Sequence, residues 1–251
     1  MRPQCGHFRF WEQHGIGRRR IQLCRVRRWF EYCNNCGGQA NVLSEGNDKV
    51  VLGSGDVTVN TAISGSATVV GGGGPMYFSS QQSTAASTVV GGTGTVTAYL
   101  GSGGGSVTGG SAGSNVLIGG AGVATLVGGG ASDYVHGNSG ADHLGGYGAG
   151  TVIQSGSGLG ITTAVANASN ETIIGSVGSL SAVAKGLDTV LGAGGTSIVL
   201  AQGAGSAYVA GGSGNLQLNS TGSTAASTVI CGSGAVTDYL VGGDGRAQGR
   251  R

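Results

Sequence analysis

The chain has 251 residues, of which 56 are Gly, 10% are charged and 5% are aromatic. So little bulky side chain excludes a conventional close-packed globular core, and the lack of Gly at every third position excludes collagen. The sequence predicts no transmembrane helix, because it has no run of 18 apolar residues, and it shows no apolar region typical of a signal peptide. The regular recurrence of Val, Ile and Leu favours a repeat with many tight turns over disorder.

The formal net charge of +2 conceals two unlike regions. Residues 1–36 contain eight Arg and two Glu, whereas residues 45–245 contain nine acidic residues and two Lys. Both Trp and four of the five Cys precede residue 40. We therefore expect an aberrant basic segment at 1–44 that is disordered or translated in a wrong frame, a repeat domain at 45–245, and a basic tail at 246–251.

The N-terminal segment permits three interpretations. Cys33 and Cys36 form a C-x-x-C pair, but a zinc ribbon needs two such pairs. The Arg residues interleaved with Trp29 and Phe30 would suit nucleic acid, which we do not expect as a partner. A third interpretation explains more: shifted by one base, RRWFEYCN can read GGSNTVI, which has the composition of the repeat. We interpret residues 3–38 as the repeat array in a wrong frame, and the coding DNA decides this.

A period of nine residues dominates the centre of the chain. Aliphatic residues recur without a slip at Leu117, Leu126, Val135, Leu144 and Ile153. Two residues before each of them stand Asn115, Ala124, Asp133, Asp142 and Thr151. A strand of about three residues would turn one aliphatic side chain inward, and two units would close a coil of 18 residues. The sequence predicts an all-β fold, a right-handed parallel β-roll or β-helix solenoid of stacked coils built from nine-residue glycine-rich repeats.

A longer duplication lies over this period. Residues 83–105 return as residues 223–245, with 15 of 23 positions identical. The duplication marks residues 45–245 as one repetitive architecture.

Two stretches carry a resemblance to a known family. GNSGADHLG (137–145) fits the pattern G-[GN]-x-G-x-D-x-U-x, where U is aliphatic, and GGGASDYVH (128–136) fits with Ala131 in place of one Gly. They resemble the haemolysin-type calcium-binding (RTX) nonapeptide repeats, and the valine-rich stretches resemble degenerate β-strand repeats of bacterial surface proteins. The resemblance implies a β-roll with Ca²⁺ held in its turns, folded outside the cell.

The spacing of the predicted coils limits this calcium hypothesis. Asp133 and Asp142 are nine residues apart, so they should lie on opposite edges of the roll. At a spacing of 18, only Asn115 and Asp133 bring two oxygen-bearing side chains together, whereas Ca²⁺ prefers six to eight oxygens. Two alternatives remain: a calcium site that involves Asp133, Asp142 and Asn115, or turn aspartates in a calcium-independent solenoid.

The possible catalytic motifs in this sequence lack the surroundings that catalysis needs. GGSAG (109–113) matches G-x-S-x-G, but it follows no hydrolase-length strand and precedes no predicted helix. His136 and His143 fall at outward repeat positions without a nucleophile partner. We expect the protein not to be an enzyme.

The function predicted from the sequence is that of a structural repeat region in a secreted or cell-surface bacterial protein, as in an adhesin or matrix scaffold. The alternative is a calcium-dependent binding module. A third hypothesis, an ice- or polysaccharide-binding face, needs aligned Thr ladders, and TVT (95–97) with TVI (151–153) does not supply one. Expected partners are Ca²⁺, cell-surface or matrix components, and other copies through uncapped coil ends.

Overall fold

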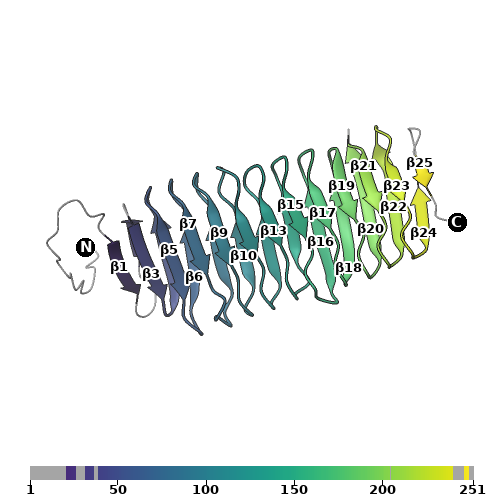
Figure 1. Cartoon of the computed structure of the whole chain (residues 1–251). Coiled ribbons are helices and arrows are strands. Elements are labelled where there is room, and N and C mark those ends of the chain that lie inside the picture. Colours follow the sequence, from purple (N-terminus) through teal and green to yellow (C-terminus); the bar gives the residue numbers. More distant parts are fainter. Residues whose placement is uncertain (1–20, 27–31, 37–38, 204, 240–245, 249–251) are drawn as a thin grey trace.

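The computed structural model describes residues 21–26, 32–36, 39–203, 205–239 and 246–248, with side chains from residue 39 to 239 except 204. Within these residues all regular secondary structure is β, and the strands form one elongated stack (Figure 1). No helix in this part of the chain is long and apolar enough to cross a membrane.

The strands belong to two sheets, one of 13 and one of 12 strands. The 13-stranded sheet contains β1 (Ile21–Val26), β3 (Gln39–Ser44), β5 (Val57–Thr61), β7 (Met76–Ser79), β9 (Val96–Tyr99), β11 (Val116–Ile118), β13 (Tyr134–His136), β15 (Val152–Gln154), β17 (Thr172–Ile174), β19 (Asp188–Leu191), β21 (Ala207–Ala210), β23 (Thr228–Ile230) and β25 (Arg246–Gln248). The 12-stranded sheet contains β2 (Tyr32–Cys36), β4 (Asn47–Leu52), β6 (Ser66–Val70), β8 (Ser87–Val90), β10 (Gly105–Thr108), β12 (Ala124–Val127), β14 (His143–Gly146), β16 (Ile161–Ala166), β18 (Ser179–Ala184), β20 (Ser197–Gly203), β22 (Leu216–Ser223) and β24 (Val236–Tyr239).

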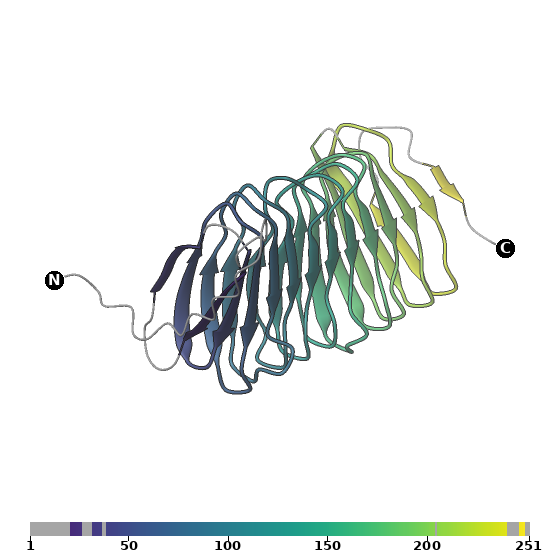
Figure 2. The same cartoon turned by 60° about the vertical axis from the view of Figure 1, so that its left-hand side comes forward.

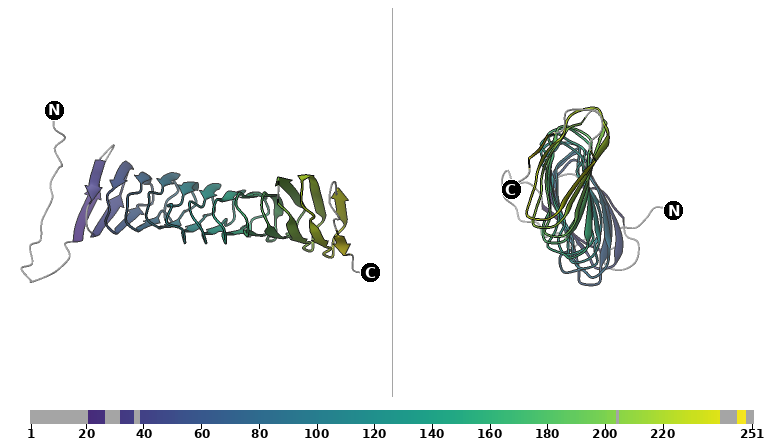
Figure 3. Two further views of the ribbon diagram at one scale, coloured as in Figure 1. Left: turned by 90° about the horizontal axis from the view of Figure 1, so that it is seen from above. Right: turned by 90° about the vertical axis from the view of Figure 1, so that its right-hand side faces the viewer.

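The chain alternates between the two sheets, so each coil contributes one strand to each of them (Figure 2). Each strand pairs in parallel with the strand two positions along the chain, as β11 does with β13. Seen along the stack, the coils lie behind one another as narrow loops (Figure 3). The predicted all-β parallel solenoid is therefore confirmed.

The predicted inward positions form the core between the sheets. Leu117, Val135 and Ile153 stack in register in the 13-stranded sheet, and each is 0% exposed. Leu126 and Leu144 do the same in the 12-stranded sheet. Alternation along each strand places one apolar side chain inside and its neighbours outside, which is why a nine-residue spacing of aliphatics suffices for a core. A coil buries these side chains only against its neighbours, as in other repeat architectures.

Coil length varies more than the repeat predicts. Eighteen residues separate Leu117, Val135 and Ile153, but Ile153 pairs with Ile173 and Ile173 with Val190, which gives coils of 20 and 17 residues. The core register persists because the turns absorb the added or missing residues.

Both sheets extend in front of residue 45, where the sequence places the start of the repeat domain. β3 pairs with β5, and β1 and β2 continue the sheets beyond it. Residues 1–20 lie outside the described residues, as do the side chains of Cys5, Cys24, Cys33 and Cys36. The wrong-frame hypothesis for residues 3–38 stays a prediction.

Candidate functional site

Asp133 and Asp142, the two motif aspartates, lie in different parts of the coil. Asp133 directly precedes β13 in the 13-stranded sheet, and Asp142 directly precedes β14 in the 12-stranded sheet. Both side chains are buried, with exposed fractions of 1% and 0%. Each carboxylate makes its hydrogen bonds at its own edge of the stack, so the structure does not bring the two carboxylates together.

Asp133 uses both carboxylate oxygens for hydrogen bonds to the backbone and to Asn115. Oδ1 accepts from the backbone N–H of Asn115 at 2.7 Å and from its Nδ2 at 2.8 Å. Oδ2 accepts from the N–H of Gly130 at 3.0 Å. A carboxylate that accepts several N–H bonds needs no cation to compensate its burial.

Asn115 meets Asp133 as the spacing of 18 predicts, but it presents its donor group. Its Oδ1 points elsewhere and accepts from the N–H groups of Val96 at 2.7 Å and Gly110 at 2.9 Å. Its Nδ2 also donates to the carbonyl of Gly110 at 2.7 Å. These four contacts fix which end of the amide faces Asp133. The pair therefore offers no cage of oxygens, and Ca²⁺ does not fit between these two side chains as they stand.

Asp142 repeats the arrangement on the other edge. Its Oδ1 accepts from the N–H of Ala124 in the preceding coil at 2.8 Å, and its Oδ2 accepts from the N–H of Asn138 at 3.0 Å. Both oxygens thus satisfy backbone donors at the start of a strand and in a turn. Ca²⁺ does not fit here either unless it displaces these donors.

A shared hydrogen bond connects several of these residues, and it was not anticipated from the sequence. In Asn115, Asp133, Asp142 and Asp188, the side chain two residues before the inward residue accepts the N–H at the same position one coil earlier. Thr151 and Glu171 occupy the same position but bond within their own turn. Serines make the shared bond as well: Ser87 accepts from Ala67 and Ser227 from Ala207, each at 3.2 Å. The N–H at a strand start needs an acceptor once it is buried, and this side chain supplies it.

The backbone immediately before these positions is left-handed on one edge of the stack. Ser114, Ser132, Gly150 and Asn170 have φ values of 52°, 57°, 77° and 63°. They precede Asn115, Asp133, Thr151 and Glu171, which occupy equivalent positions in four successive coils. A left-handed residue lets the chain turn sharply into the strand, and only Gly adopts it without strain. The turn thereby aims the next side chain into the stack.

Glu171 is the residue of this edge that the motif search missed. It is 1% exposed, and its Oε2 accepts from the N–H of Ala168 at 2.7 Å. Its Oε1 is buried without a hydrogen-bond partner. Burial, with a smaller contribution from nearby Asp188 and Asp133, raises the pKa of Glu171 to about 7. Its position two residues before Ile173 is the signal that would have found it.

Asp188 makes the same hydrogen bond to the preceding coil, whereas Asp48 bonds only within its own coil. Asp188 accepts from the N–H of Glu171 at 3.0 Å and from that of Gly186 at 2.9 Å, and burial raises its pKa. Asp48 Oδ2 accepts from Ser44 Oγ at 2.7 Å, whereas Oδ1 is buried without a partner. At the positions two residues before the inward aliphatic, Asp48 Oδ1 and Glu171 Oε1 are thus buried carboxylate oxygens without a hydrogen-bond partner.

Asp238 departs from the pattern because it occupies an inward position. It pairs in register with the fully buried Leu218, and both of its carboxylate oxygens are buried without partners. The equivalent residue in the first copy of the duplication is Ala98, which is 0% exposed. Burial raises the pKa of Asp238.

No metal centre of ordinary composition stands out. Among the residues that the structure describes, no group of three or more His, Cys, Asp and Glu side chains is close enough to hold a metal ion. His136 and His143 lie on the outer faces of different sheets. Burial lowers the pKa of His136, while Asp142 acts in the opposite direction.

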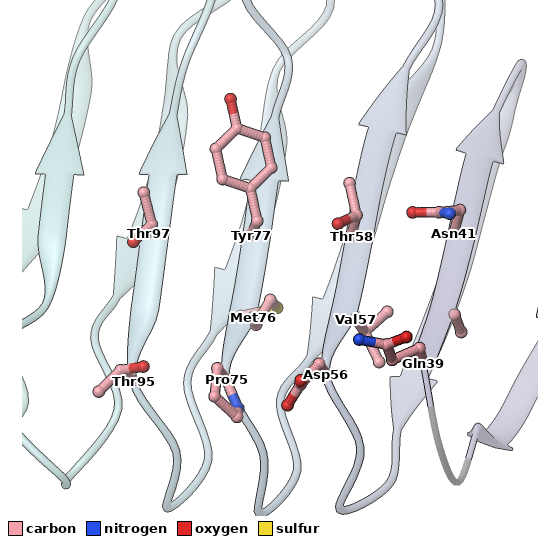
Figure 4. A pocket seen from close by; sticks show the side chains of 11 residues that line it. Gln39, Asn41, Asp56, Val57, Thr58, Pro75, Met76, Tyr77, Thr95 and Thr97 are labelled. Carbon is pink, nitrogen blue, oxygen red and sulfur yellow. The ribbon is translucent and has the colours of Figure 1, made fainter. Parts of the chain in front are cut away.

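A shallow depression of about 470 Å³ lies on the outer face of the 13-stranded sheet (Figure 4). Its floor consists of outward side chains from four neighbouring strands, namely Asn41, Thr58, Tyr77 and Thr97. Asp56 and Gln39 lie at its margin.

Comparisons of the chain with known proteins found no match. No protein-family model matches the chain, and neither a curated protein nor a solved structure matches it. The RTX resemblance therefore rests on the sequence, where its motif is strongest at residues 128–145.

Proposed function

We propose that the solenoid is a structural, non-catalytic rod within a secreted or cell-surface bacterial protein, where it spaces or displays other parts as an adhesin or matrix scaffold does. The observation that carries this proposal is the use of the acidic side chains. Asp133, Asp142 and Asp188 direct both carboxylate oxygens to donors of their own or the preceding coil. Side chains that would otherwise perform chemistry instead join successive coils.

The hydrogen-bond network supports a mechanical role. Parallel pairing runs along the stack in both sheets, and the polar side chains add bonds between coils in the same direction. Extension of the rod must break bonds in both sheets at once. Each coil depends on its neighbours, so length can grow by duplication without a new core, as the repeated segments 83–105 and 223–245 illustrate.

The alternative function is a calcium-dependent module that folds outside the cell. The observation that favours it is that Asp48 Oδ1 and Glu171 Oε1, in widely separated coils, are each buried without a hydrogen-bond partner. Either oxygen would supply one negatively charged ligand, and backbone carbonyls of the turns would have to supply the rest. Asp133, Asn115 and Asp142 would enter such a site only after losing hydrogen bonds that they now make.

Small-angle X-ray scattering of the full chain in a calcium chelator tests the proposal. A structural rod that is complete without metal gives the scattering of an elongated particle, unchanged when calcium is added. An expanded, chain-like profile in chelator that becomes rod-like only with calcium contradicts the proposal and supports the module.

A further inference from the structure

A lysine amine and an asparagine amide meet at one edge of the 12-stranded sheet. Asn167 directly follows β16 and Lys185 directly follows β18, and these two strands pair in register up to Ala166 and Ala184. The two side chains therefore extend from equivalent positions in successive coils. Lys185 Nζ donates to Asn167 Oδ1 at 2.8 Å. A nucleophilic group thus lies against the carbonyl of an amide.

This contact brings the amine nitrogen close to the carbon that it could attack. An amide C=O bond is about 1.23 Å long, so the 2.8 Å contact with Oδ1 places Nζ of Lys185 no more than about 4 Å from Cγ of Asn167. Productive arrangements have the reacting atoms about 3–3.5 Å apart. Rotation within the lysine side chain makes up the difference, and no segment of the chain has to move.

The amide is also held on the side of its leaving nitrogen. Nδ2 of Asn167 donates to the carbonyl of Gly146 in the preceding coil at 3.0 Å, and the backbone N–H of Asn167 donates to the same oxygen at 3.2 Å. The carboxyl of Glu171 adjoins this glycine, because a Cβ on Gly146 would overlap Oε1 of Glu171. That oxygen is buried and has no hydrogen-bond partner among the described residues, so it is available to carry a proton.

We propose that Lys185 and Asn167 form an amide cross-link between successive coils, in a reaction that the chain carries out on itself. The unprotonated amine attacks Cγ of Asn167, a bond forms from Nζ to Cγ, and the bond from Cγ to Nδ2 breaks. Glu171 takes one proton from the attacking nitrogen and gives it to the departing nitrogen, which leaves as ammonia. The reaction consumes no other reactant. The inference goes beyond the structural role proposed above, and its chemistry does not depend on that role.

The cross-link would make one contact between coils permanent. It closes the chain between residues 167 and 185 into a covalent loop, which restricts the unfolded state and raises the melting temperature. Lys185 is exposed. Because only an unprotonated amine attacks, an exposed lysine reacts slowly at neutral pH and faster in alkaline solution. We therefore expect the cross-linked fraction to grow as the folded protein ages.

Trypsin digestion of the denatured full chain tests the cross-link, because Lys185 is the one Lys or Arg between residues 50 and 245. An unmodified lysine gives separate peptides 50–185 and 186–246. A cross-linked lysine blocks cleavage, so residues 50–246 stay together as one peptide that is lighter by one ammonia. Mass spectrometry compares the two products before and after incubation of the folded chain at about pH 9.

Three variants locate the reacting groups. Lys185→Arg keeps the positive charge and the trypsin site but removes the primary amine, and Asn167→Ala removes the amide. Both should give the two separate peptides without loss of ammonia. Gln202→Ala is the matched control: Gln202 follows Ala201, which pairs with Ala184, so its amide lies on the other side of the lysine. This control should cross-link like the unaltered chain, and circular dichroism checks that all three keep the β signal.

Glu171→Gln tests the proton transfer. The Gln amide cannot take up and return the proton, so ammonia release should slow about tenfold or more. An unchanged rate in a folded variant overturns the place given to Glu171.

Two results overturn the cross-link itself. One is complete cleavage at Lys185 after alkaline incubation of the folded chain. The other is a loss of ammonia that persists in Lys185→Arg, because it would come from cyclisation of an asparagine onto its own backbone. Scattering in chelator would still show a rod in either case, so failure of this inference is distinguishable from failure of the structural role.

Discussion

The side-chain amide of Asn115 donates a 2.8 Å hydrogen bond to Oδ1 of Asp133 in the next coil. Ca²⁺ is bound by oxygen atoms, and an amide N–H group is not a ligand for it. Here a donor meets an acceptor, and the pair joins two coils directly. The motif aspartate thus links two successive turns through its own hydrogen bonds.

Asp133→Ala should destabilise the fold with or without calcium. The change removes the acceptor of three donors, namely two from the buried Asn115 and the N–H of the half-buried Gly130. Each unsatisfied group costs about 1–3 kcal/mol, and partial relaxation brings the expected total to about 2–4 kcal/mol. Chemical denaturation of both proteins measures the loss. Asp56→Ala, at an exposed carboxylate, is the control and should change stability by less than about 0.5 kcal/mol.

Glu171 should make stability depend on pH near neutrality. Its folded pKa of about 7 exceeds the ordinary value of 4.5, so the folded state keeps a proton that the unfolded chain has released. The stability that this carboxyl contributes is therefore complete below pH 4.5 and is lost as the pH rises through about 7. The full effect is on the order of 3 kcal/mol.

Glu171→Gln tests this dependence, because Gln cannot ionise. The variant should unfold at a melting temperature that varies less between pH 4.5 and 8 than that of the unaltered chain. Asp56→Asn is the control and should keep the original dependence. An unchanged pH profile in Glu171→Gln would place the titration elsewhere, with Asp188 as the next candidate.

Gly146 and Glu171 should be energetically coupled. A Cβ added to Gly146 would overlap Oε1 of Glu171, so Gly146→Ala forces the buried carboxylate to move. We expect a loss of about 1–3 kcal/mol for Gly146→Ala in the unaltered chain. In a Glu171→Ala background the same change should cost clearly less, and a double-mutant cycle measures the difference. Equal costs in both backgrounds would show that the two residues do not interact.

Asp238→Ala should stabilise the protein. It removes a buried carboxylate whose two oxygens have no partner, and it restores the residue that the first copy has at Ala98. The gain should be larger at neutral pH than in acid, because burial raises the pKa of Asp238 and disfavours its charged form. Thermal melting at two pH values checks both statements. Ala98→Asp makes the reverse exchange and should destabilise the fold.

The repeat spacing allowed the fold and the core register to be predicted. Leu117, Val135 and Ile153 are inward and in register because a period of 18 closes one coil of two short strands. The variable coil lengths could not be predicted, since loops accept inserted residues without disturbing the strands. The alignment of outward residues could not be predicted for the same reason: Thr68 and Thr88 are 20 residues apart, Ser106 and Thr125 are 19 apart, and each pair is aligned only by strand pairing.

The role of the motif aspartates was predicted only in part. Spacing placed Asp133 beside Asn115 and apart from Asp142, as the structure shows. Whether the amide or the oxygen of Asn115 would face the carboxylate depends on the N–H groups of Val96 and Gly110, which lie in the preceding coil and in the turn. Such donors are invisible in a motif, because every residue except Pro carries one.

If the coils are joined by their own side chains, the fold needs no ion. Thermal melting of the full chain, followed by circular dichroism in chelator and in millimolar calcium, tests this, with Asp133→Ala measured alongside. The account predicts a folded β signal in chelator, one melting temperature for the unaltered chain in both solutions, and a lower one for Asp133→Ala in both. A melting temperature that rises with calcium in the unaltered chain, and not in Asp133→Ala, would contradict it.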